Sequence, residues 1–267
     1  MMTDDQREPF DLTGRGIVLT GGGGHLGRAM ALALARAGAT VCVMGRTPEP
    51  LRKVREDAGA FAENIVISRG DVGRERDLLA AMEALEARGV ALRGWVNNAY
   101  HGVSELLGEL TREGLRKTFE GGVIDAMLAT QLAAERMRAH GEGGAIVNIA
   151  SMYGMVSPDP AAYTAHPAFH NPPAYGAAKA ALLQFTRYAG VHYAPEGIRV
   201  NAISPGPFPN PSVQREETFV TALERRVPMR RIGRPEELEG AVVFLLSDAA
   251  SYMTGQNIVI DGGWTAW

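Results

Sequence analysis

The chain has 267 residues, a formal net charge of −3 and one cysteine, Cys42. This length is sufficient for one α/β domain with a large core. A net negative charge without a Lys/Arg block argues against a nucleic-acid partner. One cysteine excludes an internal disulfide, and the six histidines form no H-E-x-x-H metal pattern. The sequence shows neither a secretory signal nor an apolar run of about 18–20 residues. We therefore expect a soluble, cytoplasmic protein that does not enter a membrane.

Strand-like and helix-like segments alternate along the sequence. The strand-like segments are short and rich in β-branched residues, and they comprise residues 16–20, 40–44, 64–68, 92–97, 145–149, 199–203 and 257–260. Helical periodicity is found in residues 26–37, 49–57, 74–88, 115–140, 175–193 and 235–246. This alternation predicts a parallel sheet with helices on both faces. Right-handed crossovers then give a doubly wound, Rossmann-type sheet in one domain that spans residues 1–267.

Two long segments without periodicity, 152–173 and 205–215, are rich in proline. Loops of this length in a compact domain are usually functional lids or disordered segments. Because both follow predicted strands, we expect them at the carboxyl edge of the sheet, where ligands bind in this architecture. We therefore predict a substrate-loop insertion at 152–173 and a lid segment near 205–231.

A glycine-rich turn, TGGGGHLG at residues 20–27, lies between the first predicted strand and the first predicted helix. Gly22, Gly24 and Gly27 fit the pattern G-x-G-x-x-G. Glycines let the backbone approach a pyrophosphate, and the helix N-terminus offers free N–H groups to it. The motif by itself is also compatible with a flexible turn that binds nothing.

Tyr175 and Lys179 are four residues apart in a predicted helix, so their side chains share one face. A nearby cation favours the charged form of a phenol, and we expect Lys179 to lower the pKa of Tyr175. An unperturbed phenol, with a pKa near ~10, is a poor base at neutral pH, whereas a lowered pKa gives a usable acid/base. Taken alone, this spacing is also typical of a solvated helix face.

Further motifs follow in a fixed order along nearly the whole chain. They comprise Asp71-Val72, Asn97-Asn98-Ala99, NIAS at 148–151, NAISPG at 201–206, GRPEE at 233–237 and the C-terminal stretch 254–263. With Thr20, Gly21 and Gly27 matching a T-G-x-x-x-G-x-G turn, the chain resembles the short-chain dehydrogenase/reductase family. The resemblance implies an NAD(P)-dependent oxidoreductase that interconverts a secondary alcohol and a ketone by hydride transfer.

The resemblance also assigns roles to residues. It implies that Tyr175 exchanges a proton with the substrate, that Lys179 lowers the pKa of Tyr175 and binds the nicotinamide ribose, and that Ser151 orients the substrate oxygen. A hydroxyl donor beside the reacting oxygen stabilises its developing charge. The implied cofactor-binding residues are Thr20, Gly21, Gly23, Gly24, His25, Leu26, Gly27, Arg46, Asp71, Val72, Asn98, Ala99, Tyr175, Lys179, Pro205, Gly206 and Phe208.

Three positions depart from the family pattern. His25 stands where the family has a glycine, and its side chain would crowd the pyrophosphate unless it turns aside. Tyr100 replaces the glycine of the N-N-A-G motif. Gly122 stands where the family has an asparagine that helps to hold a proton-relay water. The relay either persists through the backbone carbonyl of Gly122 or is rerouted or weakened.

The cofactor preference depends on the end of the second predicted strand. An acidic residue there would bind the ribose 2′-OH of NAD and repel a 2′-phosphate. This chain has Arg46 instead, and a guanidinium suits a phosphate. We therefore expect NADP(H) to be favoured over NAD(H), with a solvent-facing Arg46 as the alternative.

The insertion before Tyr175 bears on the substrate. Ser151 and Tyr175 are 24 positions apart, about twice the separation usual in the family. The additional aromatic and polar residues include Tyr153, Tyr163, His166, Phe169, His170 and Asn171. We interpret them as a wall that shapes the substrate pocket, although a surface loop in an oligomer contact is an alternative. Family members similar to gluconate 5-dehydrogenase have such insertions, which suggests a sugar, polyol or sugar-acid substrate.

Two further expectations follow from the resemblance. The departures leave open a catalytically weak member that acts as a cofactor-binding sensor or scaffold, although Ser151, Tyr175 and Lys179 are all present. Family members are commonly tetramers or dimers that pack through two long helices, here 115–140 and 175–193. The apolar C-terminal residues 264–267 also suggest cover by a neighbouring subunit. We expect a homotetramer or dimer that binds a small-molecule substrate.

Overall fold

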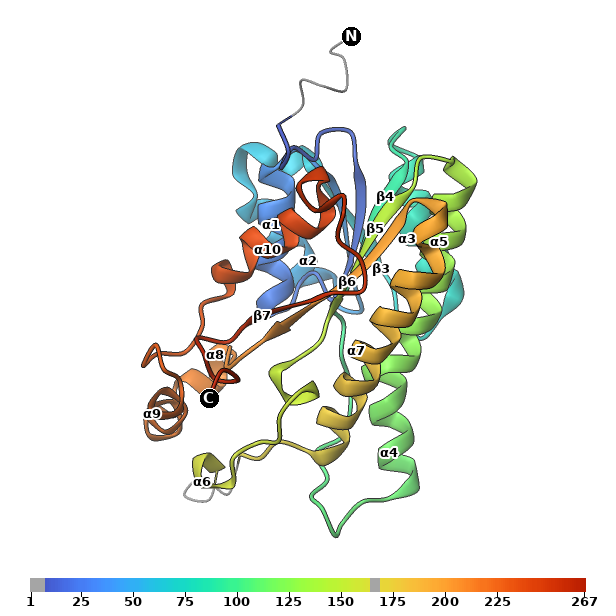
Figure 1. Ribbon diagram of the computed structural model, residues 1–267. Coiled ribbons are helices and arrows are strands. Elements are labelled where there is room, and N and C mark those ends of the chain that lie inside the picture. The colour runs from blue at the N-terminus through green and yellow to red at the C-terminus, as the bar shows by residue number, and fades with distance from the viewer. Residues whose placement is uncertain (1–7, 164–168) are drawn as a thin grey trace.

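One sheet of seven parallel strands forms the centre of the computed structural model, which describes residues 8–163 and 169–267 (Figure 1). The strands are β1 (Gly16–Thr20), β2 (Thr40–Gly45), β3 (Ile65–Arg69), β4 (Leu92–Asn97), β5 (Gly144–Ile149), β6 (Ile198–Pro205) and β7 (Asn257–Ile260). Their spatial order is β3-β2-β1-β4-β5-β6-β7, and every neighbouring pair is parallel. The order reverses between β1 and β4, and ligands bind at such a switch point.

Alternating side chains of the strands enter two separate cores. In β1, Ile17 and Leu19 pack into the core on one face, and Val18 packs into the core on the other. This follows from the two-residue period of a strand. Because both faces are covered, the strands are mostly apolar and do not alternate regularly between apolar and polar residues.

Helices cover both faces of the sheet (Figure 1). One face carries α1 (His25–Arg36), α2 (Pro48–Asp57) and α10 (Glu239–Leu246), and the other carries α3 (Glu75–Glu86), α5 (Asp125–His140) and α7 (Pro173–Tyr193). The predicted doubly wound Rossmann-type fold is therefore confirmed. Among the described residues, no helix is long and apolar enough to cross a membrane.

Three short helices and the start of α4 extend beyond the carboxyl ends of the strands, at the bottom of Figure 1. They are α6 (Pro160–Tyr163), α8 (Pro211–Gln214), α9 (Glu217–Arg226) and α4 (Arg112–Phe119). Helix α9, which lies inside the predicted lid segment, was not predicted from the sequence. Its buried face is formed by Phe219 and Leu223, four residues apart.

The predicted helix at 115–140 is interrupted. A π-helical turn, Glu120–Ile124, separates α4 from α5. Gly121 and Gly122 lie in this turn, and both are buried. An added Cβ on Gly121 would lie 2.3 Å from the carbonyl oxygen of His101, so the close approach of this loop requires glycine. π-turns of this kind are frequent at functional sites.

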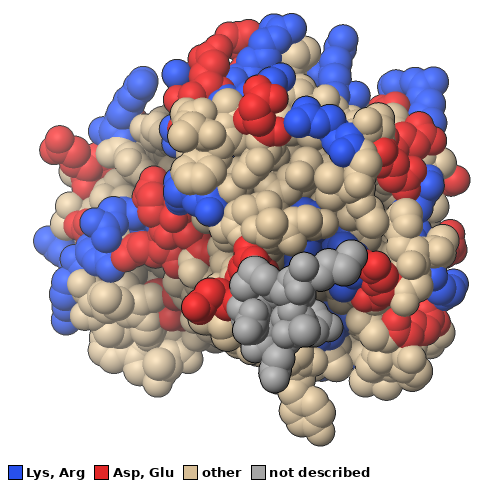
Figure 2. All heavy atoms as spheres, turned by 90° about the horizontal axis from the view of Figure 1, so that it is seen from above, with Lys and Arg blue, Asp and Glu red and all other residues tan. Residues whose placement is uncertain are grey.

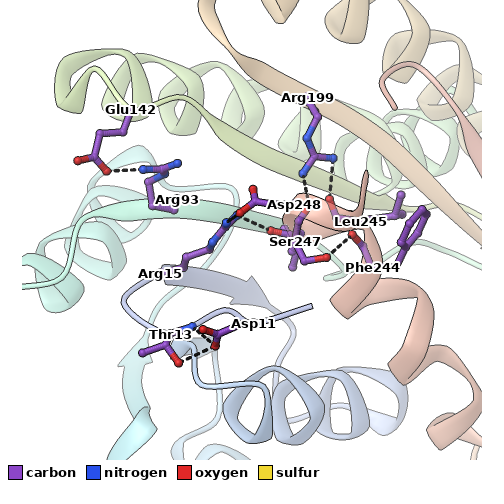
Figure 3. A network of polar contacts seen from close by, with 11 residues as sticks. Asp11, Thr13, Arg15, Arg93, Glu142, Arg199, Phe244, Leu245, Ser247 and Asp248 are labelled. Atoms are coloured by element: carbon purple, nitrogen blue, oxygen red, sulfur yellow. Dashed lines mark hydrogen bonds and ion pairs between the residues drawn. The ribbon is translucent and has the colours of Figure 1, made fainter. Parts of the chain in front are cut away.

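At the opposite edge of the sheet, where the strands begin, arginine side chains bind carbonyl groups at the C-terminal end of α10 (Figure 3). Arg199 donates hydrogen bonds to the carbonyl oxygens of Leu245 (2.9 Å) and Ser247 (3.0 Å), and Arg15 donates to that of Leu246 (3.1 Å). Cations at the C-terminus of a helix satisfy its free carbonyls and complement its dipole. On the face seen from this edge, basic and acidic side chains are interspersed (Figure 2). The arginines therefore serve to fix α10 to the sheet.

Candidate active site

The glycine-rich turn lies at the carboxyl end of β1. Gly21 has a φ of 65°, a left-handed conformation that favours glycine. A Cβ on Gly27 would lie 2.2 Å from the carbonyl oxygen of Gly21, so α1 can start this close to the turn only with glycine there. Gly24 is the N-cap of α1 and provides no side-chain cap. The first N–H groups of α1 are therefore available to an anion.

The end of β4 braces this turn from behind. The Thr20 hydroxyl donates to the carbonyl oxygen of Val96 (3.1 Å) and accepts from the N–H groups of Asn98 (3.0 Å) and Ala99 (3.1 Å). The Asn98 amide donates to the carbonyl oxygen of Thr20 at 2.9 Å and to that of Gly21 at 3.1 Å. Thr20, which the sequence analysis placed among the cofactor-binding residues, is thus buried beneath the turn and holds its shape.

A cavity of about 620 Å³ extends from the glycine turn along the ends of β2, β3 and β4. Predicted cofactor residues that line it are Gly21, Gly23, Gly24, His25, Leu26, Gly27, Arg46, Asp71, Val72, Asn98 and Ala99. A Cβ on Gly23 would lie 2.8 Å from Pro50, and one on Gly24 would lie 3.2 Å from the carbonyl oxygen of Gly21. This backbone cradle, with the free helix N-terminus, fits the pyrophosphate of a dinucleotide.

His25 lines the cavity and also faces the predicted lid. The pKa of its imidazole is lowered by burial, whereas the charge of Glu236 and a hydrogen bond with the Pro209 backbone raise it. Its Nε2 atom is buried without a partner among the described residues. The hydrogen bond with Pro209, a residue of the predicted lid segment, shows that the ring turns toward the lid backbone. Asn210, a lid residue that the sequence analysis did not select, also lines the cavity.

A smaller cavity of about 200 Å³ adjoins the first one. Leu26, Asn98 and Tyr100 line both cavities. The other residues around the smaller cavity are Ile149, Ala150, Ser151, Tyr175, Lys179, Pro205, Gly206 and Phe208. All three predicted catalytic residues thus line this smaller cavity. Every predicted cofactor residue that does not line the first cavity lines the smaller one, with the exception of Thr20.

The three predicted catalytic side chains are held by the end of β5 and the start of α7. Ser151 follows β5 and accepts a hydrogen bond from the N–H of Tyr153 at 3.1 Å. Tyr175 lies in the first turn of α7, and Lys179 lies one turn later. The Lys179 ammonium is buried and donates to the carbonyl oxygen of Ile149 at 2.7 Å. Strand and helix thus converge on one point.

The electrostatics of this centre differ from the sequence-based expectation. Burial raises the pKa of Tyr175, and a hydrogen bond with Ser151 lowers it in part. Burial lowers the pKa of Lys179 to about 8. The prediction that Lys179 lowers the pKa of Tyr175 below its usual value is therefore wrong for this structure. Desolvation of the phenol outweighs the ammonium, whose Nζ lies 5.8 Å from the centre of the Tyr175 ring.

Aromatic side chains from three distant segments pack above this centre, and we call them the aromatic wall: Tyr153, Tyr163, Phe169, Phe219 and Trp264. The rings of Phe169 and Phe219 stack at 4.4 Å, and Tyr163 lies 5.7 Å from Phe219. The hydroxyls of Tyr153 and Tyr163 are 2.6 Å apart. The insertion thus packs against α9. His166, which we also assigned to the wall, lies outside the described residues.

The remaining polar residues of the insertion lie at its edge. The Ser104 hydroxyl and His170 Nε2 are 2.8 Å apart. Buried atoms of His170 (Nδ1) and Asn171 (Oδ1) have no partner among the described residues. Phe219 and Trp264 belong to the aromatic wall but were not predicted from the sequence to do so. The amphipathic phase of residues 217–226 was the signal that could have indicated the buried face of α9.

Comparison with known proteins identifies the family. The profile of a family described as "Enoyl-(Acyl carrier protein) reductase" matches residues 24–265. A short-chain type dehydrogenase/reductase from Mycobacterium marinum has a solved structure that covers 97% of this chain and 98% of its own, with 32% identity and a TM-score of 0.86. The chain belongs to the short-chain dehydrogenase/reductase family. It is an oxidoreductase of alcohols and ketones that uses an NAD(P) cofactor.

Relatives within this family carry several names. The 2,5-dichloro-2,5-cyclohexadiene-1,4-diol dehydrogenase of Sphingobium indicum is 34% identical over 96% of this chain and 99% of its own length. The galactitol 2-dehydrogenase (L-tagatose-forming) of Cereibacter sphaeroides is 33% identical over 98% of this chain and 100% of its own. A relative from Sinorhizobium fredii, 34% identical over 98% of this chain, is longer, and the chain spans 45% of it. Short-chain dehydrogenase/reductases named for cyclic and for open-chain alcohols are thus similarly related to this one.

Proposed function

We propose that this short-chain dehydrogenase/reductase interconverts a secondary alcohol and a ketone with NADP(H), and that Ser151, Tyr175 and Lys179 form its catalytic centre. The convergence of these three side chains in one cavity that adjoins the glycine turn carries the proposal. Leu26, Asn98 and Tyr100 line both cavities, so a dinucleotide along the turn would end beside Tyr175.

The chemistry follows from the positions of these groups. Oxidation of an alcohol removes one proton and one hydride, and NADP⁺ held in the cavity along the glycine turn would supply the hydride acceptor. Tyr175 takes the proton from the substrate hydroxyl at its phenol oxygen, and in the reverse direction it returns the proton. Ser151 hydrogen-bonds to the same substrate oxygen and orients it. Burial raises the pKa of Tyr175, so the phenolate that this step requires must be stabilised, and we propose that the nearby Lys179 ammonium offsets part of that cost.

The preference for NADP(H) rests on two guanidinium groups. Arg46 lines the larger cavity directly after β2. Arg69 ends β3, where it pairs in register with Gly45, and its Nε lies 3.3 Å from the carbonyl oxygen of Arg46. Parallel neighbouring strands thus place a second cation that the sequence analysis did not consider. Two guanidinium groups without an acid at the end of β2 favour a 2′-phosphate.

For the substrate we propose a cyclic or polyhydroxylated alcohol, including sugars, polyols and sugar acids. Tyr153 and Tyr163 of the aromatic wall line a further cavity of about 660 Å³, together with Met155, Val156 and Pro173, and their paired hydroxyls offer a polar contact. Rings of substrate carbon can pack on aromatic faces while hydroxyls find partners. The names of the relatives support both kinds of alcohol. In this proposal the insertion and the lid near 205–231 determine specificity.

We further propose that the protein is a homodimer or homotetramer. Apolar side chains on the outer faces of α5 and α7 are exposed: Met127, Leu128, Tyr188 and Val191. Their exposed fractions, from 42% to 75%, are large for apolar residues on two adjacent helices. At the C-terminus, Trp264 is 8% exposed because it packs in the aromatic wall, whereas Trp267 is 79% exposed. Of these two tryptophans, only Trp267 is therefore proposed to be covered by a partner.

The decisive experiment follows absorbance at 340 nm with NADPH and a panel of cyclic ketones, ketoses and oxidised sugar acids. Tyr175→Phe serves as the control, and we expect it to lower kcat about a thousandfold, since general acid–base catalysis contributes roughly 10²–10⁴. Both proteins should bind NADPH with similar affinity. If the wild type binds NADPH but never exceeds Tyr175→Phe on any substrate, a cofactor-binding sensor or scaffold is favoured instead.

A further inference from the structure

Tyr100 has an unusual place between the cofactor cavity and the catalytic centre. It follows β4 and lines both cavities. Its ring meets the ring of Tyr175 edge to face, with centroids 5.1 Å apart and an interplanar angle of 81°. The Lys179 Nζ lies over the Tyr100 ring, 5.4 Å from its centroid. One side chain therefore contacts both Tyr175 and Lys179.

The backbone around Tyr100 is shaped for its ring. A Cβ on Gly102 would lie 2.5 Å from the Tyr100 hydroxyl, and a Cβ on Gly122 would lie 3.6 Å from the ring and 2.8 Å from Ala178. Gly122 belongs to the π-helical turn, Glu120–Ile124, and Ala178 immediately precedes Lys179. A side chain at position 122 would thus displace α7 or reduce the space beside the ring. Two glycines and a π-turn together form the seat of Tyr100.

The ammonium of Lys179 needs such a neighbour. It carries three donors, and among the described residues only Ile149 accepts a hydrogen bond from it. An ion that is buried with few partners is costly, and burial lowers the pKa of Lys179 to about 8. The negative face of an aromatic ring attracts a cation within about 6 Å. Tyr100 remains neutral at physiological pH, since burial and the charge of Tyr175 raise its pKa to about 12.

We propose that Tyr100 is a positioning residue whose ring, seated on Gly102 and Gly122, holds the Lys179 ammonium beside Tyr175. The ring does so through its face toward Lys179 and its contact with Tyr175. The hydroxyl of Tyr100 is not required for this role. The structural part of the inference stands by itself, and its kinetic part rests on the function proposed above.

Lysine NMR tests the structural part directly. The chain has three lysines, of which Lys53 and Lys117 are exposed and ion-paired. The signals that disappear in Lys53→Arg and in Lys117→Arg belong to those two residues, and the remaining signals belong to Lys179. In wild type, the side-chain protons of Lys179 should be shifted upfield by the ring. Tyr100→Phe keeps this shift, and Tyr100→Leu loses most of it. The pKa of Lys179 should be about half a unit to one unit lower in Tyr100→Leu than in Tyr100→Phe. Leucine keeps the ammonium buried but has no aromatic face to stabilise its charge, whereas phenylalanine keeps both.

Kinetics test the role. With a substrate found in the carbonyl panel, Tyr100→Phe should keep kcat within about twofold, and Tyr100→Leu should lower kcat roughly fivefold to tenfold with KM nearly unchanged. Equal kcat and equal Lys179 pKa in the Phe and Leu variants would overturn the proposal. So would a wild-type Lys179 signal without an upfield shift relative to Lys53 and Lys117, even if Tyr100→Leu does not fold. If no substrate is found, the proposed function fails while the NMR result still decides the position of Lys179.

Discussion

The cofactor cavity and the aromatic wall are built in opposite ways. The cavity consists of strand ends and a glycine turn, whose backbone groups come from short contiguous segments. The wall consists of large side chains from the insertion, α9 and the C-terminus, and the stacked pair Phe169 and Phe219 is 50 positions apart in the sequence. A site made of backbone keeps a recognisable sequence pattern, whereas a site made of packed rings depends on which distant segments meet. A site made of backbone can thus be retained while a wall of packed rings changes.

Among the substitutions that distinguish the aromatic wall from the cofactor cavity, Phe219→Ala is expected to have the largest effect, and this effect is on stability. Phe219 is 4% exposed and joins α9 to the insertion, so its removal leaves a cavity in the wall. Truncation of a buried phenylalanine costs about 3–5 kcal/mol. We expect the free energy of unfolding in urea to fall by about 3 kcal/mol, the value for the lower end of that range.

The matched control is Phe61→Ala, because Phe61 is 40% exposed and lies far along the sheet on Gly59–Asn64. We expect its effect to stay within about 0.5 kcal/mol. NADPH affinity should be retained by both variants below their unfolding transitions. A Phe219→Ala protein of wild-type stability, or one that loses NADPH binding while folded, would contradict the separation of wall and cavity.

Arg46→Ala tests the other region. Loss of a guanidinium that contacts a 2′-phosphate removes a charge-assisted pair, and we expect kcat/KM for NADPH to fall about tenfold while that for NADH is nearly unchanged. Arg52→Ala is the control, since this neighbouring arginine is exposed and pairs with Glu49. A preference for NADH that persists in Arg46→Ala would remove NADP(H) from the proposed function.

The smallest effect is expected at Glu237, which follows the predicted lid segment and belongs to neither region. Glu237 accepts hydrogen bonds from Arg231 and from the N–H of Arg234, and these lower its pKa to about 2. Because the folded-state pKa lies below that of the unfolded chain, ionised Glu237 stabilises the fold above about pH 4.5. This stabilisation is lost as the pH falls from there toward 2.

Glu237→Gln should therefore be less stable than wild type by about 1 kcal/mol at pH 7, the range of a partly exposed ion pair with an N-terminal cap. The difference should shrink as the pH is lowered and vanish near pH 2. Urea unfolding of both proteins between pH 2.5 and 7 measures it. A difference that is constant over this range would show that Glu237 acts through packing rather than through its charge.

Much of the fold was predictable because the period of apolar residues fixes strands and helices. The bounds of β1, β4 and β7 agree with the predicted segments, and the others differ by one to a few residues at their ends. The interruption between α4 and α5 and the helix α9 were missed. A π-turn adds one residue to a helical turn without changing the apolar pattern much, and α9 is short and flanked by proline-rich segments.

The parts of the candidate site that depend on local spacing and on strand order were predictable, and the parts that depend on packing were not. Spacing alone placed Tyr175 and Lys179 on one helix face, and strand order placed Ser151 and the glycine turn at one edge. The predicted direction of the pKa shift of Tyr175 was wrong, because the degree of burial is a property of packing. Arg69 and Phe219 escaped notice for the same reason, since their importance depends on a neighbouring strand or a distant loop.

The sequence by itself determined the order of strands and helices, the glycine cradle and the identity of the proposed catalytic residues. These features depend on local backbone preferences and on patterns within short segments. Only the tertiary structure decided that the Tyr100 ring contacts both Tyr175 and Lys179, and that Gly122 leaves room beside this ring. Such contacts arise from the close packing of segments that are distant in the chain, and packing is not encoded in any one of them.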